Sequence, residues 1–285
     1  MLIFCNQLKS PMFYDILSLY KRILERKRIM IANFHTHTAR CNHATGTDRE
    51  YVEAAIRAGV KSLGFSDHSP YWFPNGYYST HRMKPHEVED YVKSVLSLRE
   101  EYKNDIRIYL GFEAEYYPLY FDKMLKIIEP YPYDYMILGQ HYLTNEQSES
   151  HIARLANDYA SLVLYVNECI EALTTDKFFY FAHPDIVNFK GDPRLYRAEM
   201  IRLCKAAKAM NVPLEINLLG LRERREYPRI DFWQIASEIG NDVILGSDSH
   251  EPSVTAREQD IRAAMEIVNG FGLHLIEPME PKIIK

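Results

Sequence analysis

From residue 30 onward, short runs of apolar residues alternate with longer segments in which apolar positions repeat with the period of a helix. The short runs are rich in Val, Ile, Phe and Tyr, which is typical of strands buried on both faces of a sheet. We predict strands at 28–34, 60–66, 106–112, 134–139, 178–182, 212–217 and 242–247. The amphipathic segments predict helices at 48–58, 85–102, 121–128, 153–173, 193–210, 231–239 and 254–269.

Seven β-then-α units in series favour an α/β fold with a parallel sheet and helical crossovers. Closure of that sheet leaves no bare edge strand, so we expect a distorted (βα)7 barrel. The tail at 273–276 is expected to add a short strand or to cap the barrel. We find no linker after residue 30 and expect one domain over residues 30–285.

Residues 1–29 are expected to form an N-terminal extension, helical or disordered. Their apolar residues have helical spacing beside a basic cluster, which indicates a surface helix. A basic amphipathic helix that touches a membrane surface is an alternative. A third possibility is that the protein proper begins at Met30.

Composition and charge disfavour several classes of protein. The chain has 285 residues, 47% of them hydrophobic, which suits a domain with a sizeable core. A net charge of −5, with no Lys/Arg block after residue 30, argues against nucleic acid as the main ligand. No apolar run approaches the ~20 residues that span a bilayer. The four cysteines are scattered and lack CxxC spacing, so we expect a cytoplasmic protein in a reducing compartment, with no membrane partner.

Histidine and acidic residues stand at or just after the ends of the predicted strands. Nine such residues are present: His35, His37, His43, His68, Glu113, His141, His183, Asp248 and His250. The C-terminal ends of parallel strands meet at one face of a barrel, so these side chains are expected to converge there. Imidazole and carboxylate groups are ligands of zinc, manganese and iron, among which the sequence does not choose. Nine candidate ligands predict more than one metal ion.

Spacing within the set adds detail. His35 and His37 are two residues apart on a strand, and so are Asp248 and His250, so each pair projects to one face. A carboxylate can bridge two metals and an imidazole cannot, which makes Glu113 the natural bridge.

Other polar residues near the strand ends are given supporting roles. Asp67 is expected to orient His68 or to hold its loop, and Cys41 is either a thiolate ligand or a spectator. We interpret four further histidines as solvated or packing residues: His81, His86, His151 and His274. The chain has no GxSxG, Walker A or GxGxxG pattern. The expected nucleophile is therefore metal-bound water.

This set of residues resembles the polymerase and histidinol phosphatase (PHP) superfamily, and within it the bacterial histidinol-phosphatases. The matching stretches are 35–46, 64–70, 81–83, 111–116, 139–142, 182–185, 215–221 and 246–250. The resemblance implies a distorted seven-stranded barrel with a trinuclear metal site at the C-terminal ends of the strands. It assigns His35, His37, Glu113 and Asp248 to the first ion, Glu113, His141 and His183 to the second, and His43, His68 and His250 to the third.

The resemblance also implies a reaction, the hydrolysis of L-histidinol phosphate to L-histidinol and phosphate in histidine biosynthesis. The chain would then be a phosphoric monoester hydrolase that uses a metal-bridging hydroxide as its nucleophile. Asp248 or His250 is expected to pass a proton to the leaving group.

Arginine is the best bidentate clamp for phosphate, and Arg222 follows the sixth predicted strand, so we expect it to bind the phosphate. Arg82, Arg224 and Arg225 are further candidates. Glu115 shares a face with Glu113 and is expected either to support that metal ligand or to contact the histidinol amine or imidazole. Tyr116 is a further candidate for the substrate contact.

Three other functions stay open at this point. A PHP phosphoesterase acting on another substrate, such as a nucleotide or a 3′ end, is disfavoured by the acidic balance of the chain. An amidohydrolase barrel usually relies on a metal-bridging lysine, and no strand-end lysine is evident. A structural or metal-sensing barrel needs only about four closed ligands, fewer than this chain offers.

Overall fold

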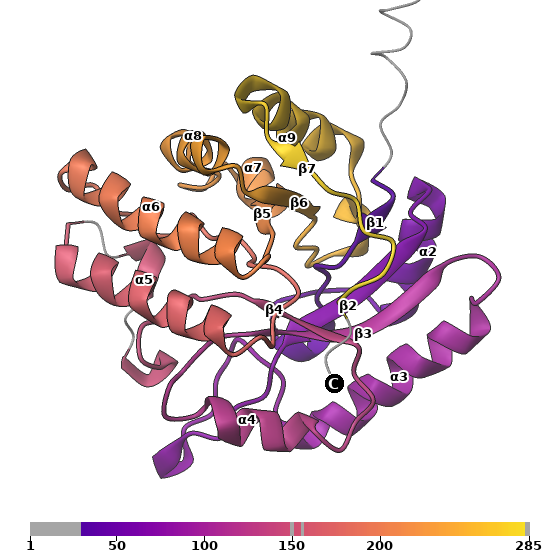
Figure 1. Cartoon of the computed structure of the whole chain (residues 1–285). Helices are drawn as coiled ribbons and strands as arrows, with labels where there is room; N and C mark the ends of the chain where they lie inside the picture. The colour runs from indigo at the N-terminus through magenta and orange to yellow at the C-terminus, as the bar shows by residue number, and fades with distance from the viewer. Residues whose placement is uncertain (1–29, 149–150, 155–156, 283–285) are drawn as a thin grey trace, which may run out of the picture.

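The computed structural model describes residues 30–148, 151–154 and 157–282, in which parallel strands alternate with helices (Figure 1). Four parallel strands form one sheet, in the order β1 (Ala32–Asn33), β2 (Ser62–His68), β3 (Arg107–Ala114) and β4 (Tyr135–Leu138). Three more form a second parallel sheet, in the order β5 (Leu214–Asn217), β6 (Asp242–Gly246) and β7 (His274–Leu275).

Single parallel bridges connect the two sheets at both sides. Phe181 bridges to Leu138 at the end of β4 and to Leu214 at the start of β5. On the other side, Thr36 after β1 bridges to Ser249 after β6. The result is an α/β fold with a curled parallel sheet.

Helices cover the outside of this sheet (Figure 1). Their bounds are α2 (Asp48–Ala58), α3 (Val88–Glu101), α4 (Phe121–Ile128), α5 (Tyr159–Thr174), α6 (Pro193–Ala209), α7 (Leu218–Glu223), α8 (Ile230–Ile239) and α9 (Glu258–Phe271). Helix α3 packs on β3, and α5, α6, α8 and α9 contact one another in series. Short 3-10 helices lie at Ala39–Cys41, Pro74–Gly76, Pro85–Glu87, Glu146–Ser148, Ile152–Arg154 and Pro252–Val254.

Aromatic side chains fill the interior of the curled sheet. Phe34, Tyr135 and Phe179 are buried and meet edge to face, with ring centroids 5.4–6.1 Å apart. The Tyr135 hydroxyl donates to the carbonyl oxygens of Phe34 at 2.8 Å and Phe65 at 3.0 Å. A Cβ at Gly64 would lie 2.2 Å from that hydroxyl, so this strand position needs glycine. This packed interior supports the strands whose C-terminal ends carry the expected ligands.

Most of the predicted elements are present, with altered bounds. The predicted strand at 178–182 has bridges only at Phe181, to Leu138 and to Leu214, although the N–H groups of Phe179 and Ala182 also donate to β4. The first strand is confirmed only at Ala32–Asn33, and residues 28–29 lie outside the described part of the chain. The helix predicted from residue 153 begins at Tyr159, where Asp158 accepts from the Ala160 N–H as its N-cap. The tail adds the short strand β7, whereas helix α7 was not predicted.

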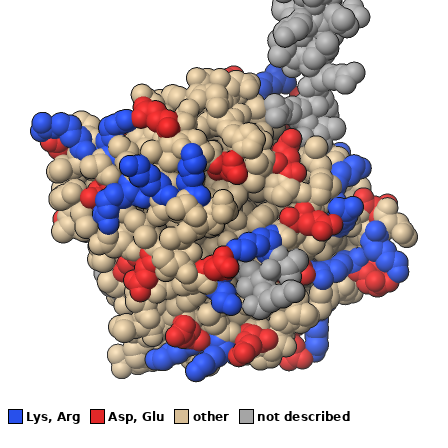
Figure 2. Space-filling model, viewed as in Figure 1, with Lys and Arg blue, Asp and Glu red and all other residues tan. Residues whose placement is uncertain are grey.

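The expected N-terminal extension, residues 1–29, lies outside the described residues. Among the described residues, no helix is long and apolar enough to cross a membrane. On the face drawn in Figure 2, basic and acidic side chains lie close to one another over much of the surface.

Candidate metal centre

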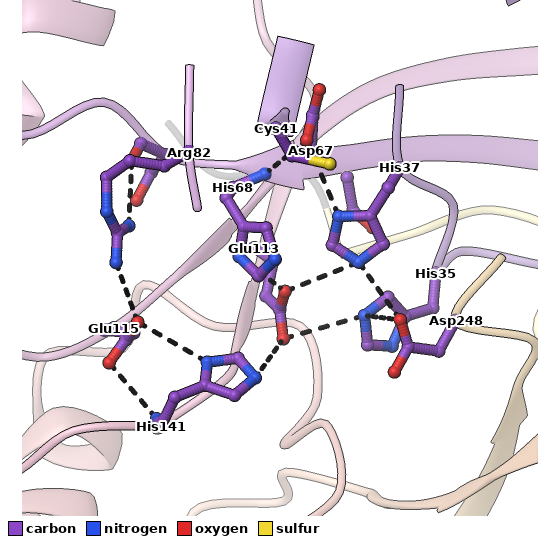
Figure 3. A network of polar contacts seen from close by, with 12 residues as sticks. His35, His37, Cys41, Asp67, His68, Arg82, Glu113, Glu115, His141 and Asp248 are labelled. Atoms are coloured by element: carbon purple, nitrogen blue, oxygen red, sulfur yellow. Dashed lines mark hydrogen bonds and ion pairs between the residues drawn. The ribbon is translucent and has the colours of Figure 1, made fainter. Parts of the chain in front are cut away.

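The C-terminal ends of the strands bring the expected ligands together around Glu113 of β3. Figure 3 shows six of them, His35, His37, His68, Glu113, His141 and Asp248. The carboxylate oxygens of Glu113 face nitrogens of five histidines, at 2.9 Å for His183, 3.0 Å for His68, 3.5 Å for His37, 3.6 Å for His35 and 3.8 Å for His141. Oε1 faces His35, His141 and His183, and Oε2 faces His37 and His68. The two oxygens therefore address two different groups of ligands.

Asp248 gathers the remaining ligands on the other side. Its Oδ1 lies 3.2 Å from His37 Nε2, 3.5 Å from His35 Nε2 and 3.3 Å from His250 Nδ1. His250 Nε2 is in turn 3.0 Å from His43 Nε2. All nine predicted residues thus belong to one continuous cluster.

Neighbouring groups hold several of these imidazoles in place. His35 Nδ1 is 2.8 Å from Glu215 Oε2, and both side chains are fully buried. His43 Nδ1 is 2.8 Å from the Cys41 carbonyl oxygen. In metal sites, such contacts fix the orientation of the ring and leave the other nitrogen free to bind.

Glu215 is a site residue that the prediction missed. It lies in the middle of β5, and its Oε1 accepts from Asn217 Nδ2 at 2.7 Å, while the same amide donates to Asp248 Oδ2 at 3.0 Å. A single acid inside an otherwise apolar strand was the available signal, because such a charge needs a buried partner.

Many buried polar atoms of this cluster make no hydrogen bond, although several lie at ion-pair distance from one another. Among the described residues they are His35 Nε2, His37 Nδ1 and Nε2, His68 Nδ1, His183 Nδ1, Glu113 Oε2 and Asp248 Oδ1. Each such atom costs about 1–3 kcal/mol when it is left unsatisfied. A cation that accepts the lone pair of one nitrogen of each imidazole and those of the carboxylate oxygens removes much of that cost, so the donor set fits divalent metal ions.

The spacing of the ligand atoms supports the same conclusion. Three atoms within 4.8 Å of one another are offered by the groups His35–His183–Asp248, His35–His37–Glu113 and His37–His68–His250. The buried histidines and acids can therefore hold metal, in more than one place.

The surroundings of both central carboxylates favour their ionised form. Burial alone would raise the pKa of Glu113, but the surrounding imidazoles, His68 first, lower it well below its usual range. Burial opposes the shift at Asp248 too, yet His35 and other neighbouring histidines hold that pKa well below normal. The cluster therefore offers two negative charges to a cation.

Backbone geometry at the site is unusual. His183 has φ 33° and Asp248 has φ 47°, a region that residues other than glycine rarely adopt. Such strained positions gather at functional sites, where the surrounding structure holds them. Gly139, which follows β4, leaves room for Glu113, because a Cβ there would lie 1.9 Å from Glu113 Oε1.

A cavity of about 340 Å³ opens over the ligands. It is within the range of small-molecule sites. Beyond the ligands, its wall is made of His81, Arg82, Glu115, Tyr142, His151, Arg154, Leu219, Glu223, Arg225 and Tyr227. His81 and His151 thus lie at the cavity, where the prediction had treated them as solvated or packing residues. His86 is exposed, and His274 pairs with Asp242.

Arg222 does not line this cavity. Its guanidinium turns to Asp260 of α9, with Nη1 3.1 Å from Oδ2, and both side chains are largely buried. Arg225 and Arg154 occupy the wall instead. The direction of the Arg222 side chain is set by a partner 38 residues away in the chain, which strand position alone does not reveal.

The expected substrate contacts Glu115 and Arg82 are buried and bonded to protein groups. Arg82 Nη2 donates to Glu115 Oε1 at 2.8 Å and to Glu146 Oε2 at 2.7 Å. Tyr116 is not among the residues of the cavity wall, and its hydroxyl donates to Glu171 at 2.9 Å. These three side chains therefore present little free hydrogen-bonding capacity to a substrate.

Comparison with known proteins gives a family and a fold. The model of the PHP domain matches residues 33–218. A Deinococcus radiodurans protein named "Probable histidinol-phosphatase" is 30% identical over 236 residues, covering 78% of this chain and 87% of that protein. The histidinol-phosphatase of Lactococcus lactis is 21% identical over 85% of this chain and 91% of its own length.

A solved structure shares the fold. It is the histidinol phosphate phosphatase of Lactococcus lactis complexed with zinc, L-histidinol and phosphate. The TM-score is 0.67 at 19% identity, and the match covers 89% of this chain and 99% of that one.

Proposed function

This chain belongs to the PHP domain family of metal-dependent phosphoesterases, and we propose that it hydrolyses L-histidinol phosphate to L-histidinol and phosphate. One observation supports the proposal: a cluster of nine histidine and acidic residues lies at a cavity whose wall also holds Arg154 and Arg225. Six of the nine line this cavity, namely His43, His68, Glu113, His141, Asp248 and His250. Metal ligands below and guanidinium groups beside them suit a small dianionic ester. The likeness to histidinol-phosphatases suggests which ester.

We assign three divalent ions, zinc, manganese or iron, to the cluster. His35, His37, Glu113 and Asp248 would hold the first, Glu113, His141 and His183 the second, and His43, His68 and His250 the third. The two-sided contacts of Glu113 support its place as a bridge. The single bridges that join the two sheets support the distorted (βα)7 barrel as the frame of this site.

In the proposed reaction, the oxygen of a water molecule bonds to phosphorus, the ester P–O bond breaks, and the leaving alkoxide takes a proton. Divalent ions in this site would supply positive charge to the phosphate and activate the water. Asp248 is anionic and can accept the proton of the water. Burial and His37 lower the pKa of His250 to about 3, so its imidazole is neutral. We assign the transfer of that proton to the leaving group to Asp248, or to His250 after it has taken up the same proton.

We move the role of phosphate clamp from Arg222 to Arg225 and Arg154, because these two line the cavity. Two protein groups fix the position of the Arg225 guanidinium. Its Nη1 donates to the Tyr227 hydroxyl at 3.0 Å, and its Nη2 lies 2.7 Å from Glu223. A guanidinium fixed in this way keeps other N–H groups available for a bidentate contact. Substrate recognition would then lie mainly with the segment after β5.

The test is a comparison of kcat/KM for L-histidinol phosphate with values for other phosphomonoesters, a nucleotide and a 3′-phosphorylated oligonucleotide. We expect L-histidinol phosphate to be preferred by a factor of more than about 100, equivalent to ~2.7 kcal/mol of differential transition-state binding. Preference for the nucleotide or the oligonucleotide would keep a PHP phosphoesterase and discard the histidinol assignment.

A further inference from the structure

Arg82, Glu115 and Glu146 form a buried ion cluster. Figure 3 shows Arg82 and Glu115 of this cluster beside the proposed ligand His141. The three side chains are between 1% and 3% exposed. They come from three separate loops, after β2, after β3 and after β4. The fold therefore brings distant segments together around a single imidazole.

The carboxylate of Glu115 is saturated by protein donors. Its Oε2 accepts from the Tyr117 hydroxyl at 2.6 Å, the His141 N–H at 3.1 Å and the Tyr142 N–H at 3.0 Å. Its Oε1 accepts from Arg82 Nη2 at 2.8 Å and lies 3.4 Å from His141 Nδ1. A carboxylate with this many partners has no capacity left for a substrate amine.

Arg82 is equally committed to the protein. Its Nε and Nη2 donate to Glu146 Oε2 at 2.9 and 2.7 Å, and its Nη1 donates to the Ser69 carbonyl at 3.0 Å. The guanidinium also stacks 5.2 Å from the ring centre of Tyr71. Its charge therefore balances buried carboxylates and fixes where Glu115 lies.

We infer that Glu115 and Arg82 are positioning residues that act through His141, holding the Nδ1–H tautomer so that Nε2 can bind metal. This inference rests on the proposed function of the site. His141 Nδ1 faces Glu115, and His141 Nε2 faces Glu113 at 3.8 Å (Figure 3). Glu115 therefore orients the ring through Nδ1, and Nε2 is directed toward the proposed metal centre. A histidine ligand held by a carboxylate in this way keeps its orientation and gains basicity.

The substitution Glu115→Gln separates this role from substrate binding. If the glutamine oxygen keeps the backbone N–H groups of His141 and Tyr142, its NH₂ group faces Arg82 and His141 Nδ1. The glutamine NH₂ and an N–H at His141 Nδ1 would both be donors facing each other. The imidazole must therefore carry its proton on Nε2, where the proton blocks metal binding. We expect the affinity for one metal equivalent to fall about 10- to 100-fold.

The experiment measures Zn²⁺ affinity by competition with a chelator, the unfolding temperature of the metal-free protein, and KM and kcat at limiting and excess Zn²⁺. Tyr117→Phe is the matched control, because it removes one hydrogen bond from the opposite oxygen of the same carboxylate and keeps its charge. Arg82→Lys keeps the charge and loses the planar fork. We expect a large affinity loss in Glu115→Gln, a smaller one in Arg82→Lys and the smallest in Tyr117→Phe, with kcat recovered in excess Zn²⁺ and KM unchanged.

Two results would overturn the inference. Unchanged Zn²⁺ affinity with a raised KM would make Glu115 a substrate contact. Equal affinity losses in Glu115→Gln and Tyr117→Phe, accompanied by lower metal-free unfolding temperatures, would reduce the cluster to a structural role. If Glu115→Gln does not fold, Arg82→Lys decides between these outcomes by the same measurements. Zn²⁺ affinity needs no substrate, so a protein inactive on L-histidinol phosphate would refute only the proposed function.

Discussion

Replacing Gly139 with alanine should disable the metal centre although every proposed ligand residue is retained. A Cβ at this position would lie 1.9 Å from Glu113 Oε1, 2.5 Å from Cδ and 2.6 Å from Cγ. Non-bonded contacts of a Cβ below 3.0 Å are essentially never found, so the carboxylate must move by at least about 1.1 Å. Glu113 cannot then keep its contacts with histidines on both sides.

The size of the effect follows from that displacement. An active site tolerates a displacement of about 0.5 Å in the position of a catalytic group, and a displacement of 1 Å lowers the rate about 10²-fold. We therefore expect kcat of Gly139→Ala to fall about 10²-fold, equivalent to about 2.7 kcal/mol in the barrier. Bound metal should also fall, because Glu113 is the shared ligand. Crowding at the site is expected to lower the free energy of unfolding by only about 1–3 kcal/mol.

The assay measures phosphate release and metal content on the same samples, with Gly270→Ala as the control. Gly270 lies in α9 and a Cβ there meets nothing within 4 Å. Alanine in a helix interior is favoured over glycine by about 1 kcal/mol, so this variant should be slightly stabilised and otherwise like the parent. A Gly139→Ala protein with parental kcat and parental metal content would refute the reasoning, as would equal losses in both variants.

Three further predictions concern metal, phosphate and pH. Removal of metal by a chelator should abolish phosphate release and lower the unfolding temperature, because the buried ligand atoms are left unsatisfied; an unchanged unfolding temperature would contradict this. Arg225→Met should raise KM for the phosphate ester about 10- to 100-fold, because a charge-assisted hydrogen bond is lost. Arg222→Met should raise KM less. Steady-state kinetics in which Arg222→Met has the larger KM would reject Arg225 as the phosphate-binding residue. Burial raises the pKa of Glu168 to about 7, so its folded pKa lies above the unfolded value, and its contribution to stability is present below about pH 4.5 and lost as pH rises through 7. Thermal unfolding of Glu168→Gln should therefore compare more favourably with the parent at pH 8 than at pH 4.5, and the opposite trend would remove this explanation.

The strand ends could be read from the sequence because one physical rule places them. Parallel strands that follow helical crossovers deliver their C-terminal residues to the same face, so a histidine after β1 and another after β4 meet although 106 residues separate His35 from His141. The period of the apolar positions is enough to locate those ends. For this reason all nine expected ligands lie in one cluster.

The surroundings of the ligands could not be read in the same way. The direction of Arg222 depends on Asp260 of α9, and the burial of Arg82 depends on Glu146 from another loop. Both are long-range contacts between charged groups, which leave no periodic pattern in the chain. Glu215 was missed because it lies inside the strand predicted at 212–217 and not at its end, and because its partner, His35, is 180 residues away in the chain.

The strand expected at 178–182 shows the limit of the apolar pattern. These residues are buried, as predicted, but only Phe181 forms bridges to its neighbours. Backbone hydrogen bonds from the N–H groups of Phe179 and Ala182 to the carbonyl oxygens of Met136 and Leu138 nevertheless place the segment beside β4. The segment still delivers His183 to the site.

The central claim is that these nine residues form one trinuclear centre that hydrolyses L-histidinol phosphate. It is tested most directly by titrating the metal-free protein with Zn²⁺ or Mn²⁺ and measuring, at each equivalent, the bound metal and the phosphate released from that substrate. We predict that activity rises until about three equivalents are bound and then levels off. Full activity at one equivalent, or a protein with all its metal that releases no phosphate from L-histidinol phosphate, would contradict the account.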